Sequence, residues 1–287
     1  MPQQTLRHPR LPAFASARDI ALATLRASAT DRVSLAAAGC AFWATTALFP
    51  SISALVSVYG LMSDPAAVAT QLDLVSDLLP PPALALIEDR IHELVRQPSD
   101  KLSLNLLIGI LLALWSAATG TKSLLSALNV AYDAVETRGI IRFQVTGLAL
   151  TLLAVLGAVV AIAGVVLLPA VLAFLGLSQF SAALIHAASL ALPVGFFAGA
   201  IALMYRVGPS RVRPAHARIM PGAAAATLLW LLASGALSYY ISHLARFGVT
   251  YGSIGAVVGI MLWFYVSAYA ALMGAELNAR MEAGQAS

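Results

Sequence analysis

The chain has 287 residues, of which 60% are hydrophobic and only 10% charged, with a formal net charge of +4, a pI near 9.5 and a mean hydropathy of +0.85. Because a soluble globular protein has about 25% charged residues, this composition excludes an ordinary soluble domain and indicates one membrane domain. The single cysteine, Cys40, excludes an intrachain disulfide and a thiolate metal site. We expect it to be a small buried apolar side chain.

Residues 1–32 are predicted to form a cytoplasmic segment that leads into the membrane domain. Their arginines are spread along the segment and no compact apolar core follows a short basic start, so we expect no cleavable signal peptide. The stretch from Phe14 to Ala29 mixes basic and apolar side chains in a helical pattern. It predicts an interfacial helix that lies along the cytoplasmic face of the membrane.

Six apolar segments are long enough to cross a membrane, since a spanning helix needs about 20 mostly apolar residues. Two of them lie in the stretch from Phe143 to Tyr205, which contains no Asp, Glu, Lys or Arg. We therefore predict an all-α, polytopic membrane protein with a six-span domain over residues 33–279 and a cytoplasmic tail over residues 280–287. The predicted spans are Val33–Leu61, Leu102–Leu125, Phe143–Leu175, Ala182–Tyr205, Pro221–Leu244 and Gly248–Ala275.

The connection between the first two predicted spans, about residues 62–101, is the largest piece outside the membrane. Apolar residues recur at helical spacing from Val68 to Leu79 and again from Leu84 to Leu94, with Pro80–Pro82 between the two runs. This pattern predicts two short amphipathic helices joined by a proline elbow.

The distribution of basic residues predicts the orientation of the chain, because lysine and arginine are retained on the cytoplasmic side. Thirteen of the 17 basic residues lie in the two termini and in the connections after the second and fourth spans. We therefore expect both termini in the cytoplasm and basic contacts with anionic lipid head groups. The same distribution explains the high pI without a nucleic-acid partner.

Polar residues at the end of the second span and in the last span are the candidate functional residues. Such residues are costly in hydrocarbon and should face protein or water. The first group is predicted to cluster at one cytoplasmic exit, where either a structural ion-pair network or a substrate vestibule would fit. The candidate substrate-binding residues are Lys122, Asn129, Tyr132, Glu136, Arg138, Tyr251, Ser253 and Glu276.

Other polar and small residues within the spans predict contacts between helices. Asn105, Gln144 and His186 are expected to make interhelical hydrogen bonds. The pairs Gly195-x-x-x-Gly199 and Gly255-x-x-x-Gly259 are typical of close helix packing, because glycine lets two backbones approach.

The sequence predicts neither a catalytic centre nor a cofactor or metal site. The five histidines are scattered over different loops and spans, and no His-x-His or His-Glu-x-x-His pattern occurs. A metal-dependent hydrolase or nuclease needs several ligands that converge on one ion. We therefore expect that the protein is not an enzyme.

Several motifs occur in one order along the chain: Ala47-Leu48-Phe49-Pro50, Asn129-x-x-Tyr132-x-x-x-Glu136-x-Arg138, Tyr205-Arg206-x-x-Pro209, Pro221-Gly222-Ala223, Tyr251-Gly252-Ser253-Ile254-Gly255-Ala256, Leu262-Trp263 and Gly274-Ala275-Glu276-Leu277-Asn278-Ala279. With these motifs the chain resembles the YihY/BrkB family of bacterial inner-membrane proteins, over about Asp31 to Ala279. The resemblance implies six helices with both termini inside, and a role in the bacterial envelope whose biochemical basis is open. Some members were labelled ribonuclease BN, and one was named for resistance to serum killing.

Two functions remain open from the sequence. One is a transporter, or a protein that handles a lipid or another envelope precursor, with membrane lipids as partners and a lipid or small molecule as substrate. The alternative is a non-transporting scaffold or assembly factor in envelope biogenesis. The sequence does not indicate an oligomeric state.

Overall fold

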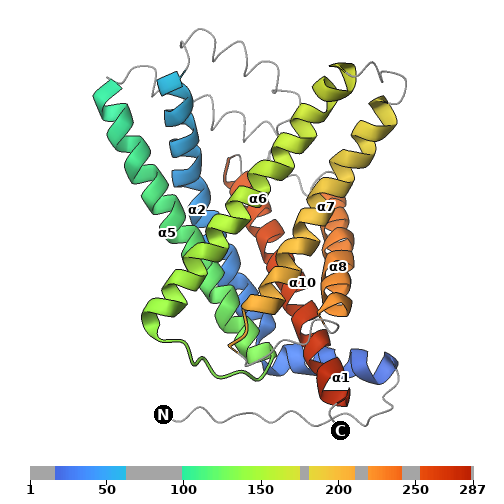
Figure 1. Ribbon diagram of the computed structural model, residues 1–287. Helices are drawn as coiled ribbons and strands as arrows, with labels where there is room; N and C mark the ends of the chain where they lie inside the picture. The colour runs from blue at the N-terminus through green and yellow to red at the C-terminus, as the bar shows by residue number, and fades with distance from the viewer. Residues whose placement is uncertain (1–16, 63–98, 175–180, 211–218, 241–252, 286–287) are drawn as a thin grey trace. The chain divides into compact units, whose positions relative to one another are not determined.

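The structure, a computed structural model, describes residues 17–62, 99–174, 181–210, 219–240 and 253–285 (Figure 1). The described part of the chain is helical and contains no strand. Its long helices are α1 (Ala17–Thr30), α2 (Val33–Met62), α5 (Ser99–Ala131), α6 (Ile140–Phe174), α7 (Ser181–Val207), α8 (Met220–Tyr239) and α10 (Ser253–Gln285). The predicted all-α class is confirmed.

Five of the described helices contain a segment that could cross a membrane, by length and composition. The segments long and apolar enough to cross a bilayer are Val33–Ala54, Leu106–Ala131, Ile140–Ala161, Met220–Tyr239 and Val257–Ala283. Helix α7 adds the shorter apolar stretch Ala191–Val207. Each predicted span overlaps one of the long helices from α2 to α10, although residues 241–252, at the end of the fifth predicted span and the start of the sixth, are outside the described residues. Several helices with exposed apolar side chains and this composition define a multi-pass membrane protein.

One predicted helix end differs from the observed one, and another prediction falls outside the described residues. Helix α10 continues to Gln285, beyond the predicted end at Ala275. The polar side chains of Glu276, Asn278 and Arg280 in these additional turns are buried, so hydropathy alone placed the end of the helix too early. The two amphipathic helices predicted between the first two spans fall in residues 63–98, which are outside the described residues.

The predicted interfacial helix corresponds to α1. Leu22 and Leu25 are exposed on this helix, together with charged residues, and its place at a membrane surface stays a prediction. The chain turns into α2 through Arg32, whose φ of 53° lies in the left-handed region. This turn carries Asp31, which has a side chain only 5% exposed.

The chain divides into two compact units. Unit 1 comprises Met1–Ala37, Thr121–Leu232 and Ser267–Ser287, and unit 2 comprises Ala38–Gly120 and Ala233–Val266. The candidate residues that the structure describes with their side chains all belong to unit 1. Each unit is treated by itself below.

The core of unit 1 combines large apolar side chains with small residues at helix crossings. Leu125 and Leu128 of α5, Tyr205 of α7 and Leu272 of α10 are almost completely buried. Helix α6 packs along α7, where Gly157 lies so close to the ring of Phe196 that a Cβ at this glycine would come within 2.7 Å of it. These contacts position the ends of α5, α7 and α10, on which the polar site is built.

The predicted close packing at Gly195 and Gly199 is not observed. Among the described residues, nothing lies within 4 Å of a Cβ built at either glycine. A close approach in unit 1 is made by Gly222 of α8 and Gly274 of α10, which face each other. Neither glycine belongs to the small-x-x-x-small pairs that the sequence analysis named.

Unit 2 contains a tight contact between α2 and α5. A Cβ at Gly109 would come within 3.3 Å of the Pro50 carbonyl oxygen, and Ser116 donates a hydrogen bond of 3.2 Å to the carbonyl of Trp43. The rings of Trp43 and Trp115 meet edge to face at 5.6 Å. Cys40 is buried, as predicted.

Candidate functional site

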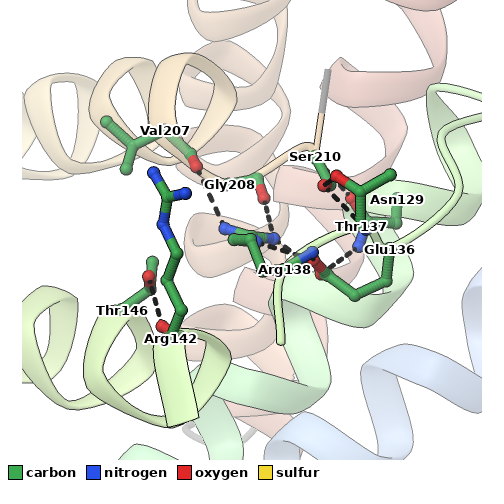
Figure 2. Close-up of polar contacts among 9 residues, drawn as sticks. All are labelled: Asn129, Glu136, Thr137, Arg138, Arg142, Thr146, Val207, Gly208 and Ser210. Carbon is green, nitrogen blue, oxygen red and sulfur yellow. Dashed lines mark hydrogen bonds and ion pairs between the residues drawn. The ribbon is translucent and has the colours of Figure 1, made fainter. Parts of the chain in front are cut away.

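The loop between α5 and α6, residues 132–139, is held by an ion pair between residues two positions apart (Figure 2). Arg138 Nε donates to Glu136 Oε1 and Arg138 Nη2 donates to Oε2, both at 2.7 Å. The backbone N–H of Arg138 also donates to Oε1, at 2.9 Å. A two-pronged pair of this kind fixes the orientation of the two side chains as well as their distance, and it ties together the two ends of a short stretch of the loop.

The same guanidinium group binds the end of α7 (Figure 2). Arg138 Nη2 donates to the carbonyl of Gly208 at 2.8 Å, and Nη1 approaches the carbonyl of Val207 at 3.5 Å. The last carbonyls of a helix have no partner within the helix, and a cation near them is favourable. Arg138 therefore joins the α5–α6 loop to the C-terminus of α7.

Asn129, at the end of α5, connects both sides of this junction. Its Nδ2 donates to Glu136 Oε2 at 2.8 Å, and its Oδ1 accepts from the backbone N–H of Ser210 at 2.7 Å. The Ser210 hydroxyl in turn lies 2.8 Å from the Thr137 hydroxyl and accepts from its N–H at 3.1 Å. We call these five residues, Asn129, Glu136, Thr137, Arg138 and Ser210, the loop network.

The loop network changes the acidity of its carboxyl group. Hydrogen bonds from Arg138 lower the pKa of Glu136 to about 2, and further donation by Asn129 acts in the same direction, while partial desolvation opposes it. Glu136 is therefore ionised throughout the physiological range. Its charge is matched by Arg138, so the loop network is electrically neutral.

A second polar group, Asn278 of α10, caps the start of α8. Its Oδ1 accepts from the N–H of Gly222 at 2.7 Å, and its Nδ2 donates to the carbonyl of Ile219 at 3.0 Å. The first N–H groups of a helix lack intrahelical partners, so this side chain does from another helix what an N-cap residue does locally. Nδ2 also lies 3.3 Å from the hydroxyl of Tyr132. Asn278 has no exposed surface.

Two glycines allow α8 and α10 to approach closely enough for this cap. A Cβ at Gly274 would collide with the carbonyl of Gly222, the hydroxyl of Tyr205 and the Cβ of Ala226. A Cβ at Gly222 would collide with the carbonyl of Gly274 and with Asn278. The Tyr205 hydroxyl donates to the carbonyl of Ala271. Gly222 and Gly274 are therefore positions where α7, α8 and α10 cross and where only glycine fits without moving a helix.

A third polar group lies between α10 and the α1–α2 turn. Arg280 Nη2 is 3.2 Å from Glu276 Oε2 and 3.9 Å from Asp31 Oδ2. The side chains of Arg280 and Asp31 are each 5% exposed, and that of Glu276 is completely buried. We call Asp31, Glu276 and Arg280 the buried charge cluster.

Lys122 makes a different contact. Its Nζ donates to Gln144 Oε1 at 2.7 Å, which links α5 to α6 and confirms the predicted interhelical hydrogen bond of Gln144. The hydroxyl of Thr121, the residue before Lys122, lies 2.8 Å from the hydroxyl of Thr151, about two turns after Gln144 on α6. Among the described residues no carboxylate forms an ion pair with Lys122.

The structure therefore separates the predicted candidate residues. Asn129, Glu136 and Arg138 come together in the loop network, while Tyr132 contacts Asn278 and Glu276 belongs to the buried charge cluster. Tyr251 lies outside the described residues, as do the side chains of Ser253, the first residue of α10, and of Asn105 and His186.

Three residues that the sequence analysis did not single out as site residues have prominent polar roles: Asp31, Asn278 and Arg280. The spacing of Glu276, Asn278 and Arg280 at the end of a long apolar helix is a signal that favours buried polar contacts over a solvated tail. No comparable signal marks Asp31, whose burial depends on a distant part of the chain.

Within the described residues, no group of three or more His, Cys, Asp or Glu side chains is arranged to hold a metal ion.

The fold and these interhelical polar groups define a multi-pass membrane protein with a polar layer at the helix ends. The sequence model of the family described as virulence factor BrkB matches residues 24–287. The chain belongs to this family.

Curated relatives are consistent with this membership. The ribonuclease-like protein YfkH of Bacillus subtilis is 30% identical over 252 residues, which cover 83% of this chain and 86% of YfkH. A UPF0761 membrane protein of Alcanivorax borkumensis is 40% identical over 86 residues, covering 30% of this chain and 20% of that protein. A UPF0761 membrane protein of Tolumonas auensis is 36% identical over 91 residues, covering 31% of this chain and 30% of that protein. No solved structure matches the chain significantly.

Proposed function

We propose that the protein is a six-span protein of the bacterial inner membrane with both termini in the cytoplasm. Five helices with the length and composition of a span, together with the shorter apolar part of α7, support the number six. The excess of basic residues in the termini and in alternate connections supports the orientation. In this topology the loop network lies at the cytoplasmic ends of α5 and α7.

We further propose that the protein handles an anionic lipid or a lipid-linked envelope precursor, and that Lys122 binds its head group. The observation that carries this proposal is the contact of Lys122 with a neutral amide, because Gln144 orients the ammonium group without cancelling its charge. By contrast, Arg138 is fully engaged with Glu136 and with two carbonyls. Of the two cations, Arg138 therefore has a structural role in the loop network, and Lys122 is the one suited to bind a ligand.

The surroundings of Lys122 suit a lipid. Side chains of α5 and α6 near this position include large exposed apolar residues, and Val145 next to Gln144 is 60% exposed. A cation beside an apolar, lipid-facing surface offers one contact for a phosphate and another for acyl chains.

The proposal is tested by lipid movement in vesicles that contain the purified protein. We expect accelerated exchange of a fluorescent phosphatidylglycerol between leaflets, reduced about tenfold in Lys122→Gln and retained in Lys122→Arg. Thr146→Ala, on the same helix as Gln144, serves as a folded control. A wild-type protein that moves neither anionic nor zwitterionic lipid would refute lipid movement.

The scaffold function is the alternative, and the same measurement separates the two. A scaffold leaves lipid exchange unchanged in all variants but loses activity in cells when a binding surface is altered. The closed hydrogen bonding of the loop network favours a structural role for that region in either case.

The printed name of YfkH raises ribonuclease activity as a further possibility for that protein. For this chain no observation in the described residues favours it. Incubation of the purified protein with labelled RNA is the direct test, and cleavage that is lost on a defined substitution would establish it.

A further inference from the structure

Two arginines beside the loop network have no partner of their own. Arg142, near the start of α6, and Arg206, near the end of α7, both have exposed side chains. Among the described residues, neither guanidinium group forms a hydrogen bond or an ion pair. In this they differ from Arg138, which is engaged with Glu136 and with the end of α7. Their donors and charges are therefore available to a ligand.

The two arginines lie where the start of α6 meets the end of α7. Arg138 holds these two helix ends together, since it donates to the carbonyl of Gly208 at 2.8 Å. Figure 2 shows the Arg142 side chain extending from α6 toward Val207, which directly follows Arg206 in the chain. Adjacent helix ends within unit 1 thus present both positive groups.

Helical periodicity places both arginines near the contact line between α6 and α7. On this line a Cβ at Gly164 would come within 3.1 Å of Leu192. Arg142 precedes Gly164 by 22 residues, which is about six turns at 3.6 residues per turn. Arg206 follows Leu192 by 14 residues, which is about four turns. Each arginine therefore returns to the side of its helix that faces the other helix.

Acidic residues of this region do not neutralise the two arginines. Residues 132–219 contain six arginines and only two acidic residues, Asp133 and Glu136. Glu136 is paired with Arg138, and neither acidic residue forms an ion pair with Arg142 or Arg206 in the described part of the chain. The surplus of positive charge favours an anionic ligand.

The surroundings of the arginines favour a lipid as the source of that anion. Arg142 is the third residue of the candidate span Ile140–Ala161, and Arg206 is the last but one of the apolar stretch Ala191–Val207. Arginine side chains at the ends of spans reach the head-group layer of a bilayer, where lipid phosphates lie. Acyl chains would contact exposed apolar side chains of the same two helices, among them Ile141, Val145 and Leu203.

From this arrangement, we propose that Arg142 and Arg206 together bind the phosphate of one anionic phospholipid at the α6–α7 end. Guanidinium groups donate paired hydrogen bonds to phosphate oxygens and keep their charge. A phospholipid with a net negative head group, such as phosphatidylglycerol, suits two positive groups. A zwitterionic lipid brings a cation of its own and fits less well.

This lipid site is separate from the one proposed for Lys122. Gln144, which contacts Lys122, precedes Gly164 by 20 residues, or about five and a half turns. It therefore lies on the side of α6 away from α7 and binds a residue of α5 instead. Because the two sites use different faces of α6, the inference does not rest on the lipid-handling function proposed above.

Native mass spectrometry of the full-length protein in a nonionic detergent, titrated with phosphatidylglycerol, tests the proposal. All measurements use a Lys122→Gln background, so that the site proposed for Lys122 makes no contribution. We expect Arg142→Gln and Arg206→Gln each to weaken binding of the first lipid about tenfold, because each removes charge-assisted hydrogen bonds. Arg26→Gln, at an exposed arginine of α1, is the matched control and should bind as tightly as the parent protein.

Neither arginine makes a contact that holds the described fold together, so both variants are expected to fold, and equal thermal midpoints check this. Any of four results would overturn the proposal. Phosphatidylcholine could bind as tightly as phosphatidylglycerol, or the loss in Arg26→Gln could equal that in Arg142→Gln, which would indicate general charge attraction. Binding could persist unchanged in either Arg142→Gln or Arg206→Gln, which would exclude a shared site. Finally, inorganic phosphate could displace the lipid, which would indicate a site for a soluble anion. All four concern bound lipid, so they are independent of the lipid-exchange measurement above.

Discussion

The Asn278 side chain of α10 accepts a hydrogen bond of 2.7 Å from the backbone N–H of Gly222, in the first turn of α8. A residue 56 positions away in the sequence therefore caps a helix. The same amide donates to the Ile219 carbonyl, so one buried side chain satisfies both a donor and an acceptor at the start of α8.

Replacement of Asn278 by alanine is expected to destabilise the protein. The N–H of Gly222 and the carbonyl of Ile219 would lose a partner in a completely buried position, at a cost of about 2 kcal/mol or more. The midpoint of thermal unfolding in detergent measures the effect. Gln144→Ala removes an amide at an exposed position and is the matched control. Equal midpoints for the two variants would contradict a capping role for Asn278.

A methyl group at Gly274 is expected to be much more damaging than one at Gly199. The Cβ of Gly274→Ala would collide with the Gly222 carbonyl, the Tyr205 hydroxyl and Ala226, which forces α8 and α10 apart. Gly199→Ala meets nothing within 4 Å among the described residues and gains up to about 1 kcal/mol of helix propensity. The yield of monodisperse protein and its thermal midpoint compare the two. Loss of stability in Gly199→Ala but not in Gly274→Ala would be inconsistent with the observed crossing.

The contribution of Glu136 to stability is expected to depend on pH. The pKa of Glu136 is lowered from its ordinary value of 4.5 to about 2 in the folded protein. A lowered pKa stabilises the folded state fully above pH 4.5, and this contribution is lost as the pH falls towards 2. The difference in thermal midpoint between the wild-type protein and Glu136→Gln should therefore shrink between pH 5 and pH 3. High salt should reduce the same difference, because the pair is partly exposed. A pH-independent difference would argue against the ion pair as its cause.

The proposed topology predicts which positions react from outside the cell. In a Cys40→Ala background, a cysteine at Thr137 in the α5–α6 loop should react with a membrane-impermeant maleimide only after the inner membrane is opened. A cysteine at Asp89, between the first two spans, should react once the reagent has reached the periplasm. Labelling with the opposite pattern would reverse the orientation, and labelling of both positions from the same side would contradict the number of spans between them.

Part of the polar site could be predicted from the sequence and part could not. Asn129, Glu136 and Arg138 lie close together in the chain, so their local spacing sufficed to predict a cluster, and the structure brings them together. Lys122 is on the same helix as Asn129, but it faces α6 and pairs with Gln144. Its separation from the loop network depends on which face of α5 meets α6, and the sequence does not specify that choice.

Composition and local pattern alone determined the all-helical class, the positions of the long helices and the membrane character of this protein. These properties follow from the transfer of apolar residues into hydrocarbon and from hydrogen bonding within each helix, both of which depend on residues near one another in the chain. Tertiary structure decided the partners of Asn278, the close approach at Gly222 and Gly274, and the burial of Asp31 beside Glu276 and Arg280. Those features join segments far apart in sequence, and only packing between helices brings their polar groups within hydrogen-bonding distance.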